Sequence, residues 1–331
     1  MKAVLVDESV SAPERRVRYA DAPDPELAPR RVLIRVDAVS VNRTDLTYQA
    51  GRYGRARALV IPGEDVAGVV EAIGPEVDNV RPGDRVMALL PGGGYAQYVA
   101  AHMLSVFPMP KNLTPEEACT IPVVFLTSWF ALMKRAGLQA GETALIQAAG
   151  SGCGMAGIAI AKWAGATVIT TAGSDEKVAR GKQIGADHGI NYSTHDFADE
   201  VMRITGGAGV DVCLESVGGE VYRKSVQVLK DSGRLVSVGR ASEQGEGGGP
   251  RGEADPAEIA RRGLRVESFS LPSTVPTGEA RAEIAVITDL LERGALRTVT
   301  DRVFPMSQVH DALAYLDNRQ NFGKVVMKAW E

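Results

Sequence analysis

One segment of the sequence has the residue types and spacing of a site for a nucleotide's phosphates. An apolar run at 144–149 leads into Gly-Ser-Gly-Cys-Gly at 150–154, and a helical apolar run begins at Ile158. With Gly157 the turn completes a G-x-G-x-x-G pattern, which lets a pyrophosphate approach the backbone N–H groups of a helix N-terminus. The alternative is a tight turn that needs glycine for its geometry alone, but the flanking strand and helix favour a nucleotide. The candidate phosphate-binding residues are Gly150, Ser151, Gly152, Cys153 and Gly154.

The residues after the next predicted strand indicate which nucleotide binds. Enzymes that use NAD carry Asp or Glu about 20 residues past the glycine turn, where it accepts a hydrogen bond from the ribose 2′-hydroxyl. Here the strand at 167–171 ends in Ala-Gly-Ser, and Ser174 and Lys177 are able to donate to a 2′-phosphate. We therefore expect NADPH. Two alternatives stay open: Ser174 merely caps the following helix, or Asp175 binds a ribose or repels a phosphate.

A parallel sheet is needed to position these residues, and the sequence predicts one. Apolar β-rich runs alternate with helical runs, and each strand and helix pair takes about 20 to 25 residues, as in a doubly wound α/β domain. The predicted strands are 143–146, 167–171, 188–190, 210–214, 234–238 and an edge candidate at 264–271. The predicted helices are 154–164, 175–184, 196–205 and 219–229.

The two ends of the chain have a different pattern. Up to about residue 118, short β-rich runs separated by Pro, Gly and Asp predict a small β-barrel or sandwich, with strands at 32–39, 66–73 and 85–90. After the sheet, the Gly-rich segment 241–253 is too polar to order itself, so we expect a mobile loop there. The last elements that we expect are helices at 278–293 and 307–318 and a closing strand at 324–328.

Composition excludes several other classes of protein. The chain has 331 residues, 45% of them hydrophobic, and 37 Lys and Arg stand against 41 Asp and Glu, so no strong field attracts nucleic acid. Three widely separated cysteines exclude a disulfide framework and a cysteine-rich zinc cage. The apolar stretch 118–133 is shorter than the ~20 residues of a membrane span and predicts a buried helix. Since the chain opens on a strand-like run rather than a signal-like segment, we expect a cytoplasmic protein.

Short motifs along nearly the whole chain resemble the medium-chain dehydrogenase/reductase superfamily, in its zinc-free quinone oxidoreductase and enoyl reductase branch. These include Val-Asn-Arg-Thr-Asp at 41–45, Pro-Gly-Glu-Asp-Val-Ala-Gly at 62–68, Gly-Tyr-Ala-Gln-Tyr at 94–98, the glycine turn, Glu-Ser-Val-Gly-Gly at 215–219 and Phe-Gly-Lys-Val-Val at 322–326. The resemblance implies a GroES-like catalytic domain at 1–118 and 269–331, a Rossmann NADP-binding domain at 119–268, and a cofactor cleft at their junction.

Zinc-dependent relatives carry a cysteine in the first motif and a His-Glu pair in the second. This sequence has Asn42 and the pair Glu64-Asp65 at these positions. Because zinc prefers thiolate and imidazole ligands, we expect no metal. Asp45, Glu64 and Asp65 are an alternative site for a harder ion, although such carboxylates also serve as acceptors in turns. Without a Lewis acid, alcohol oxidation is disfavoured and reduction of a conjugated double bond or a quinone is favoured.

The resemblance implies two catalytic residues. Asn42 matches an amide that contacts the nicotinamide ribose and the substrate, and Tyr53 matches a tyrosine that donates to the substrate carbonyl or supplies a proton. Their alternatives are a strand-end turn residue for Asn42 and an aromatic plug for Tyr53, with the proton then taken from solvent. Thr127 matches a threonine that contacts the cofactor, or else it is a helix residue that bonds back to a carbonyl.

The rest of the cofactor-binding set also follows from the resemblance. Tyr192 is expected to form a wall beside the adenine ribose phosphate, with surface packing as its alternative. Cys153 is either an oxidant sensor or, more simply, a small buried side chain. The remaining expected contacts are Val217 and Gly218 at the ribose, Gly239 and Arg240 at the nicotinamide, and Phe322 and Lys324 over the pyrophosphate, unless Lys324 is solvated.

The sequence therefore predicts a reductase that passes a hydride from NADPH to a small molecule, either a quinone or an α,β-unsaturated carbonyl. The alternatives are an NADPH-binding protein with little turnover and an alcohol dehydrogenase-like enzyme. We expect no nucleic-acid or membrane partner. Relatives usually dimerise through edge strands of their Rossmann sheets, which implies a homodimer with 264–271 as the shared edge.

Overall fold

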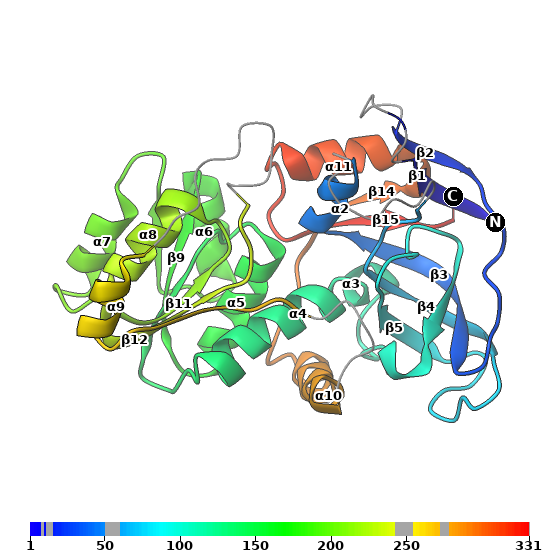
Figure 1. The fold of residues 1–331 in the computed structure, drawn as a ribbon, viewed down its shortest axis with the longest axis horizontal. Coiled ribbons are helices and arrows are strands. Elements are labelled where there is room, and N and C mark those ends of the chain that lie inside the picture. Colours follow the sequence, from blue (N-terminus) through cyan, green and yellow to red (C-terminus); the bar gives the residue numbers. More distant parts are fainter. Residues whose placement is uncertain (8–9, 11–15, 50–59, 242–253, 272–277, 331) are drawn as a thin grey trace. The chain divides into compact units, whose positions relative to one another are not determined.

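The structure is a computed structural model that describes residues 1–7, 10, 16–49, 60–241, 254–271 and 278–330. The chain forms two units, of which the first contains residues 1–123, 272–294 and 298–331. The second contains residues 124–271 and 295–297. Both ends of the chain, blue and orange to red in Figure 1, thus contribute to the first unit. Of the loop predicted at 241–253, all but its first residue lies outside the described residues.

The second unit contains a six-stranded sheet of order β10-β9-β8-β11-β12-β13 in which every pair is parallel. This is the strand order of a doubly wound dinucleotide-binding sheet, so the predicted α/β class is confirmed. The strands are β8 (Thr143–Ile146), β9 (Thr167–Ala172), β10 (His188–Asn191), β11 (Val210–Glu215), β12 (Leu229–Ser237) and β13 (Arg265–Ser268). The helices that follow them are α5 (Gly152–Trp163), α6 (Asp175–Gln183), α7 (Phe197–Ile204), α8 (Gly219–Gln227) and α9 (Pro256–Arg261).

Side-chain caps determine where most of these helices begin. Ser151, Ser174, Asp196 and Asp255 each accept a hydrogen bond from a backbone N–H in the first turn of α5, α6, α7 and α9. Such a cap contributes about 1 kcal/mol. The strands between them are apolar and buried on both faces, as central parallel strands are. Strands β8, β9 and β10 are thus each followed within a few residues by a helix with a side-chain cap, whereas α8 after β11 has none.

One boundary in this unit differs from the prediction. The helix expected to reach residue 229 ends at Gln227, and β12 already starts at Leu229 rather than at 234. Leu229 pairs with Val210 and Arg234 pairs with Val212, so the residues between them bulge out of the ladder. Within this bulge Ser232 has a positive φ of 62°. The polar residues of a bulge look like a turn in the sequence, which hides the first part of the strand.

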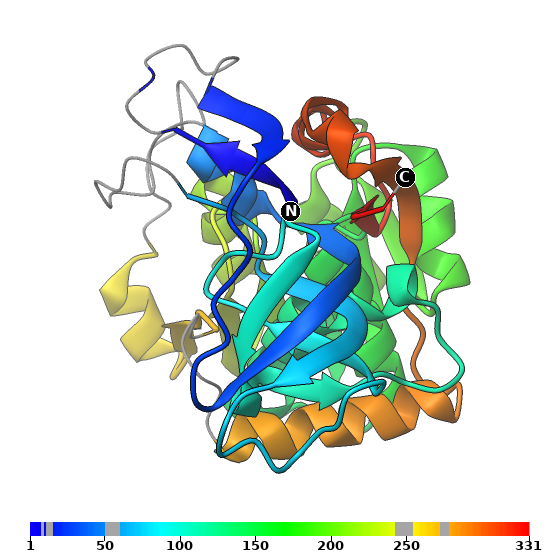
Figure 2. The same cartoon turned by 90° about the vertical axis from the view of Figure 1, so that its right-hand side faces the viewer.

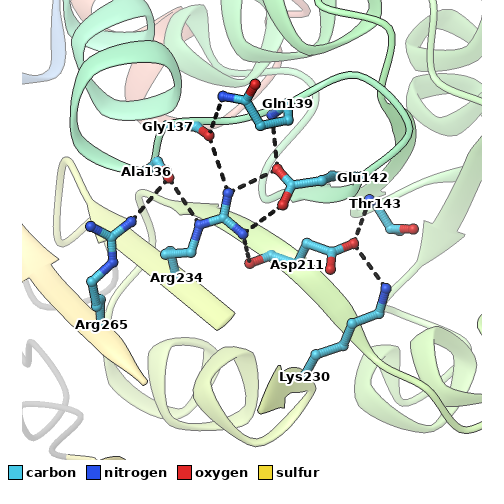
Figure 3. A network of polar contacts seen from close by, with 9 residues as sticks. All are labelled: Ala136, Gly137, Gln139, Glu142, Thr143, Asp211, Lys230, Arg234 and Arg265. Atoms are coloured by element: carbon cyan, nitrogen blue, oxygen red, sulfur yellow. Dashed lines mark hydrogen bonds and ion pairs between the residues drawn. The ribbon is translucent and has the colours of Figure 1, made fainter. Parts of the chain in front are cut away.

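Arg234, the first residue after this bulge, forms a network of polar contacts at one end of the strands (Figure 3). Its guanidinium donates to both carboxylate oxygens of Glu142 at 2.8 Å and to the carbonyls of Ala136 and Gly137 at 2.9 and 3.3 Å. Planar two-point pairing of this kind is stronger than a single contact. The Arg234 side chain is only 14% exposed, so this cluster ties the helix end before β8 to the strands β8 and β12.

The described residues of the first unit form two sheets. A seven-stranded sheet has the order β14-β15-β3-β4-β5-β7, with β6 paired to β3, and it is antiparallel except for β14 and β15. Figure 2 looks onto these strands, with the short pair β1 and β2 beside the N-terminus. The strands are β1 (Lys2–Val6), β2 (Val17–Asp21), β3 (Arg31–Val41), β4 (Asp65–Ile73), β5 (Arg85–Leu89), β6 (Tyr98–His102), β7 (Val106–Pro108), β14 (Thr300–Pro305) and β15 (Lys324–Lys328).

Helices complete the first unit, and one of them was not predicted. The helix α2 (Arg43–Gln49) starts within the motif at 41–45, where Thr44 and Thr47 gave no helical signal. The others described in this unit are α3 (Pro115–Ala118), α10 (Gly278–Glu292) and α11 (Val309–Asp317), and the last two match the predicted helices. The predicted strands at 32–39, 66–73, 85–90 and 324–328 are confirmed as β3, β4, β5 and β15.

The apolar stretch at 118–133 lies in a helix, as predicted, but this helix is longer than the stretch itself. It runs from Pro115 to Arg135 through α3, α4 (Ile121–Trp129) and a π-helical end, and its 21 residues are long and apolar enough to cross a membrane. However, 78% of its most apolar window is buried inside the protein, as in the core helix of a globular domain. Length and composition alone are therefore weak evidence for a membrane span.

Candidate functional site

The turn between β8 and α5 is shaped for close approach of a phosphate. A Cβ atom at Gly154 would lie 2.1 Å from the carbonyl oxygen of Ala148, so only glycine fits there. Ser151 caps the helix by accepting a hydrogen bond from Gly154 N at 2.9 Å. Ala148 itself has a φ of 58°, a left-handed conformation that a non-glycine residue adopts at some energetic cost and most often at functional sites. The predicted phosphate turn thus has the expected local geometry.

Buried polar side chains that the sequence analysis missed hold this turn in place. Thr171 at the end of β9 accepts from the backbone of Ala148 through its hydroxyl (3.2 Å) and from Ala149 through its carbonyl (2.8 Å). The same hydroxyl donates to the side-chain oxygen of Gln147, whose amide nitrogen donates to Ser225 at 3.0 Å. Because these groups are 0 to 2% exposed, the turn is fixed before any ligand arrives. Gln147 and Thr171 are polar residues inside otherwise apolar runs, and this was the sequence signal from which their role in holding the turn could have been predicted.

The tips of β9 and β10 bring together the residues predicted to select NADP. Ser174 caps α6 by accepting from Lys177 N at 3.3 Å, and its predicted contact with a 2′-phosphate stays a prediction. A cap uses an oxygen lone pair and leaves the hydroxyl hydrogen to donate elsewhere. Tyr192 is 48% exposed, and its hydroxyl lies 2.8 Å from the position of a Cβ built on Gly173. Asp175 accepts a hydrogen bond from Asn191 at 2.8 Å, which occupies one of its oxygens.

The tips of β11 and β12 carry the next four predicted residues. Glu215 is fully buried, and its Oε1 accepts from the backbone N–H groups of Val217 and Gly218 at 2.6 and 2.8 Å. Glu215 therefore shapes this loop, a role that the sequence analysis missed although it quoted the motif. Gly239 follows β12 and lies close to the loop, since a Cβ on it would be 3.2 Å from Ser216 O. Arg240 comes next and is exposed.

Asn42, in the first unit, lies in a buried polar cluster. Its amide nitrogen donates to Asp65 Oδ1 at 2.9 Å and, more weakly, to Ser40 Oγ at 3.4 Å. Its side-chain oxygen accepts from Lys324 Nζ, which also donates to Val41 O at 3.1 Å. Both amide hydrogens of Asn42 are therefore engaged within the protein. Any contact of this side chain with a ligand would use the second lone pair of its oxygen.

A second part of this cluster surrounds Asp45 on α2. Asp45 Oδ2 accepts from Tyr95 Oη at 2.6 Å and from Asn42 N at 2.7 Å. Its other oxygen, Oδ1, is buried without a hydrogen-bond partner in the described parts of the chain. Thr44 donates to Glu64 Oε2 at 2.7 Å, and Glu64 is the only one of the three acidic residues here that is partly exposed. Asp45 and Asp65 are 2% and 0% exposed.

The cluster raises the pKa values of all three carboxyl groups. Burial, followed by the negative charge of Glu64, raises the pKa of Asp45 to about 7. Burial also raises the pKa of Glu64, against the hydrogen bond from Thr44, and that of Asp65, against the positive charge of Lys324. Tyr95, beside Asp45, has a pKa well above its usual value because of burial and that carboxylate.

The structure places the remaining predicted residues as follows. Lys324 is 3% exposed, so the alternative that it is solvated is wrong. Phe322 is also buried, in the same unit, and Thr127 is buried in α4. Cys153 is only partly buried. Tyr53 lies outside the described residues.

Among the side chains that the structure describes, no group of three or more His, Cys, Asp or Glu is arranged to hold a metal ion. Asp45 and Asp65 instead accept hydrogen bonds from neighbouring side chains.

Comparison with known proteins agrees with this architecture. Residues 28–111 match the alcohol dehydrogenase GroES-like domain family, and residues 184–327 match the zinc-binding dehydrogenase family. A 2-haloacrylate reductase from a Burkholderia species is 32% identical over 314 residues, covering 90% of this chain and 91% of the relative. The chain belongs to the medium-chain dehydrogenase/reductase superfamily. The resemblance seen in the sequence motifs is thus confirmed.

Other relatives of this chain are much longer or have solved structures. A spectinabilin polyketide synthase system protein of Streptomyces orinoci is 36% identical over 319 residues, but the chain spans only 14% of its length. A mycobacterial protein solved in complex with NADPH matches with a TM-score of 0.89 at 29% identity, covering 99% of this chain and 100% of that one. A structure described as an NAD-dependent alcohol dehydrogenase matches with a TM-score of 0.90 at 32% identity, covering 99% of each chain.

Proposed function

We propose that this protein reduces a conjugated double bond, in an α,β-unsaturated carbonyl compound or a quinone, with NADPH as hydride donor and without a metal. The observation that carries the proposal is the β8–α5 turn, in which a backbone carbonyl lies 2.1 Å from where a side chain on Gly154 would begin. A turn of this shape, with its capped helix N-terminus, fits a pyrophosphate.

The residues at the strand tips fit the rest of a dinucleotide. The 2′-phosphate would meet the Ser174 hydroxyl, the Lys177 ammonium and the Tyr192 ring. The ribose would lie along Val217 and Gly218, where Glu215 holds the backbone. When bound, the nicotinamide supplies a hydride, and the protein positions the acceptor and stabilises the charge that develops on it.

NADPH rather than NADH is proposed on three grounds. The tip of β9 carries no carboxylate before Ser174, and the nearest one, Asp175, is bonded to Asn191 at 2.8 Å. Ser174 and Lys177 are donors, as a phosphate requires. The mycobacterial relative, 29% identical, was solved with NADPH. The relative described as NAD-dependent argues for the opposite preference, and a titration with both nucleotides decides between them.

A conjugated double bond is proposed because of a relative that matches over 91% of its own length. The Burkholderia protein is named for reducing 2-haloacrylate, in which a carboxylate is conjugated to a double bond. Asn42 and Glu64 occupy the positions at which zinc-dependent relatives have cysteine and histidine, which favours chemistry without a zinc Lewis acid. We further propose a homodimer that pairs along β13, an edge strand of its sheet as described.

The experiment is a panel of acceptors assayed with the purified chain and NADPH. We expect loss of the NADPH absorbance with enones, 2-substituted acrylates or benzoquinones, unaffected by a chelator. Oxidation of alcohols that depends on added zinc would instead support the alcohol dehydrogenase that the 32% identical structure represents. Binding of NADPH without oxidation in the presence of any acceptor would support a nucleotide-binding protein with little turnover.

A further inference from the structure

Two side chains at the tip of β10 donate hydrogen bonds to the tip of β9, within the second unit. Ser193 Oγ donates to the carbonyl oxygen of Gly173 at 2.9 Å. The amide nitrogen of Asn191 donates to Asp175 Oδ1 at 2.8 Å. Gly173 and Asp175 flank Ser174, which is proposed to meet the 2′-phosphate, so these two bonds fix the chain on both sides of that residue.

The orientation of the Asn191 side chain is set by the protein itself. Its side-chain oxygen accepts a hydrogen bond from Ser193 N at 3.0 Å, and a backbone N–H group can only donate. The amide nitrogen of Asn191 is therefore the atom that faces Asp175. The backbone of Asn191 is fixed as well, because it pairs with Ala172 in the sheet and its carbonyl oxygen accepts from His195 N at 3.1 Å. Asn191 is thus a donor with a fixed direction.

Asp175 is the residue at this tip that works against NADPH. It is the first residue of α6, directly after the capping residue Ser174, and its side chain is exposed. A carboxylate at this place repels a 2′-phosphate and accepts a hydrogen bond from the 2′-hydroxyl of NADH. Among the described residues, the donor to its side chain is Asn191. This hydrogen bond therefore determines where the carboxylate lies.

We propose that Asn191 determines nucleotide specificity: its amide holds Asp175 toward the tip of β10 and so keeps a carboxylate away from the 2′-phosphate of NADPH. This inference rests on the proposed function, in its choice of NADPH. Asn191 is a positioning residue, because it acts through Asp175 and not by touching the nucleotide. The preference for NADPH then depends on this pair as well as on the donors Ser174 and Lys177.

The first test is Asn191→Ala, which removes the donor to Asp175. The released carboxylate then repels the 2′-phosphate, and at an exposed site this repulsion corresponds to about a fivefold loss of NADPH affinity in a fluorescence titration. NADH affinity should stay the same or rise, because NADH has no phosphate there and the free carboxylate can accept from its ribose hydroxyls. The ratio of NADPH affinity to NADH affinity should therefore fall about fivefold or more.

The second test is rescue by Asp175→Asn, which removes the charge. In the wild type this substitution should change NADPH affinity by less than about twofold, because the carboxylate is already held away from the phosphate. In the Asn191→Ala background it should restore NADPH affinity to within about twofold of the wild type. A residue that only stabilised the loop would not be rescued by removal of a charge.

The matched control is Ser193→Ala, which removes the other side-chain hydrogen bond between the tips and leaves Asn191 bonded to Asp175. The affinity ratio should not change in this variant. Asn191→Asp is a second way to remove the donor, and it keeps an acceptor for Ser193 N. Its carboxylate repels Asp175, so NADPH affinity should fall by more than in Asn191→Ala. Thermal unfolding of each variant shows whether the chain is folded.

The outcomes separate this inference from the proposed reaction. An affinity ratio that falls in Asn191→Ala and is restored by Asp175→Asn supports the inference. Equal weakening of both nucleotides, absence of rescue, or the same change of ratio in Ser193→Ala overturns it. A wild-type chain that does not prefer NADPH overturns it together with the proposed choice of cofactor. Because these titrations need no turnover, a chain that reduces none of the acceptors refutes the proposed reaction, and the binding results still decide the role of Asn191.

Discussion

The selection of NADPH over NADH can be tested by the substitution Ser174→Asp. In the structure the Ser174 side chain caps α6, and an aspartate is an equally good cap, as Asp196 and Asp255 show for α7 and α9. The substitution should therefore leave the fold and its unfolding temperature unchanged. At the same time it replaces a hydroxyl donor by a carboxylate at the point where a 2′-phosphate would lie.

The size of the effect follows from two contributions. Loss of a hydrogen bond to a charged group costs about 1.5 to 3 kcal/mol. Tyr192, which borders the site, is 48% exposed, so repulsion must be taken at a dielectric constant near that of water. A carboxylate about 5 Å from a phosphate then adds roughly 1 to 2 kcal/mol. The two contributions add to about 2.5 to 5 kcal/mol, which corresponds to a loss of NADPH affinity of at least roughly 60-fold, because each 1.4 kcal/mol is tenfold.

The assay is a fluorescence titration with NADPH and NADH at two salt concentrations. NADH affinity should change little or improve, since the carboxylate can accept from the ribose hydroxyls, and the NADPH loss should shrink in high salt. The matched control is Gln183→Glu, which adds the same charge at the other end of α6, about 13 Å along the helix. If Ser174→Asp weakens both nucleotides equally, or neither, the assignment of this tip to the 2′-phosphate is refuted.

Three further predictions concern the turn between β8 and α5, the polar network around Arg234 and the buried carboxyl group of Asp45. Gly154→Ala places a Cβ 2.1 Å from a backbone carbonyl oxygen and should reduce NADPH affinity at least about tenfold by titration. Gly278→Ala, whose Cβ meets no described residue within 4 Å, should not. Arg234→Met should lower the free energy of unfolding in urea by about 2 kcal/mol, since it leaves Glu142 and two carbonyls without this partner. Because Arg234 lowers the pKa of Glu142, the difference between wild type and variant should shrink as the pH falls through that lowered pKa. Burial raises the pKa of Asp45 to about 7, so wild-type stability should decline as the pH rises from about 4 to 7, and Asp45→Asn should remove that part of the decline in thermal unfolding.

Each of these predictions has a result that would contradict it. Equal nucleotide affinity of the two glycine variants would show that the turn does not approach the ligand. An unchanged urea midpoint for Arg234→Met would show that the network in Figure 3 adds nothing to stability. Parallel pH profiles of stability for the wild type and Asp45→Asn would show that Asp45 ionises normally.

Local sequence patterns were enough to predict the parallel sheet that carries the turn between β8 and α5. Strand β8 and the start of α6 coincide with the prediction, because apolar runs, glycine turns and capping residues are all local signals. The pattern failed at β12, where a polar bulge resembles the end of a helix. It also failed at α2, which is short and is held by tertiary contacts such as the hydrogen bond from Tyr95 to Asp45.

The polar cluster of the first unit could not have been predicted from spacing. Lys324 and Asn42 are separated by 282 residues, and only the antiparallel pairing of β15 with β3 brings them together. The sequence showed the motifs that contain Asn42 and Lys324, but it did not show which residues these side chains contact. Burial of Lys324 was missed for the same reason, since a lysine near the end of a chain is ordinarily solvated.

The most direct measurement is equilibrium binding of the two reduced nucleotides to the purified wild-type chain, by calorimetry under identical conditions. The β8–α5 turn and the Ser174 tip predict saturable binding of both, with NADPH bound more tightly than NADH. If the chain releases no heat with either nucleotide and does not change the fluorescence of either, the claim that its β8–α5 turn binds a reduced nicotinamide nucleotide is contradicted.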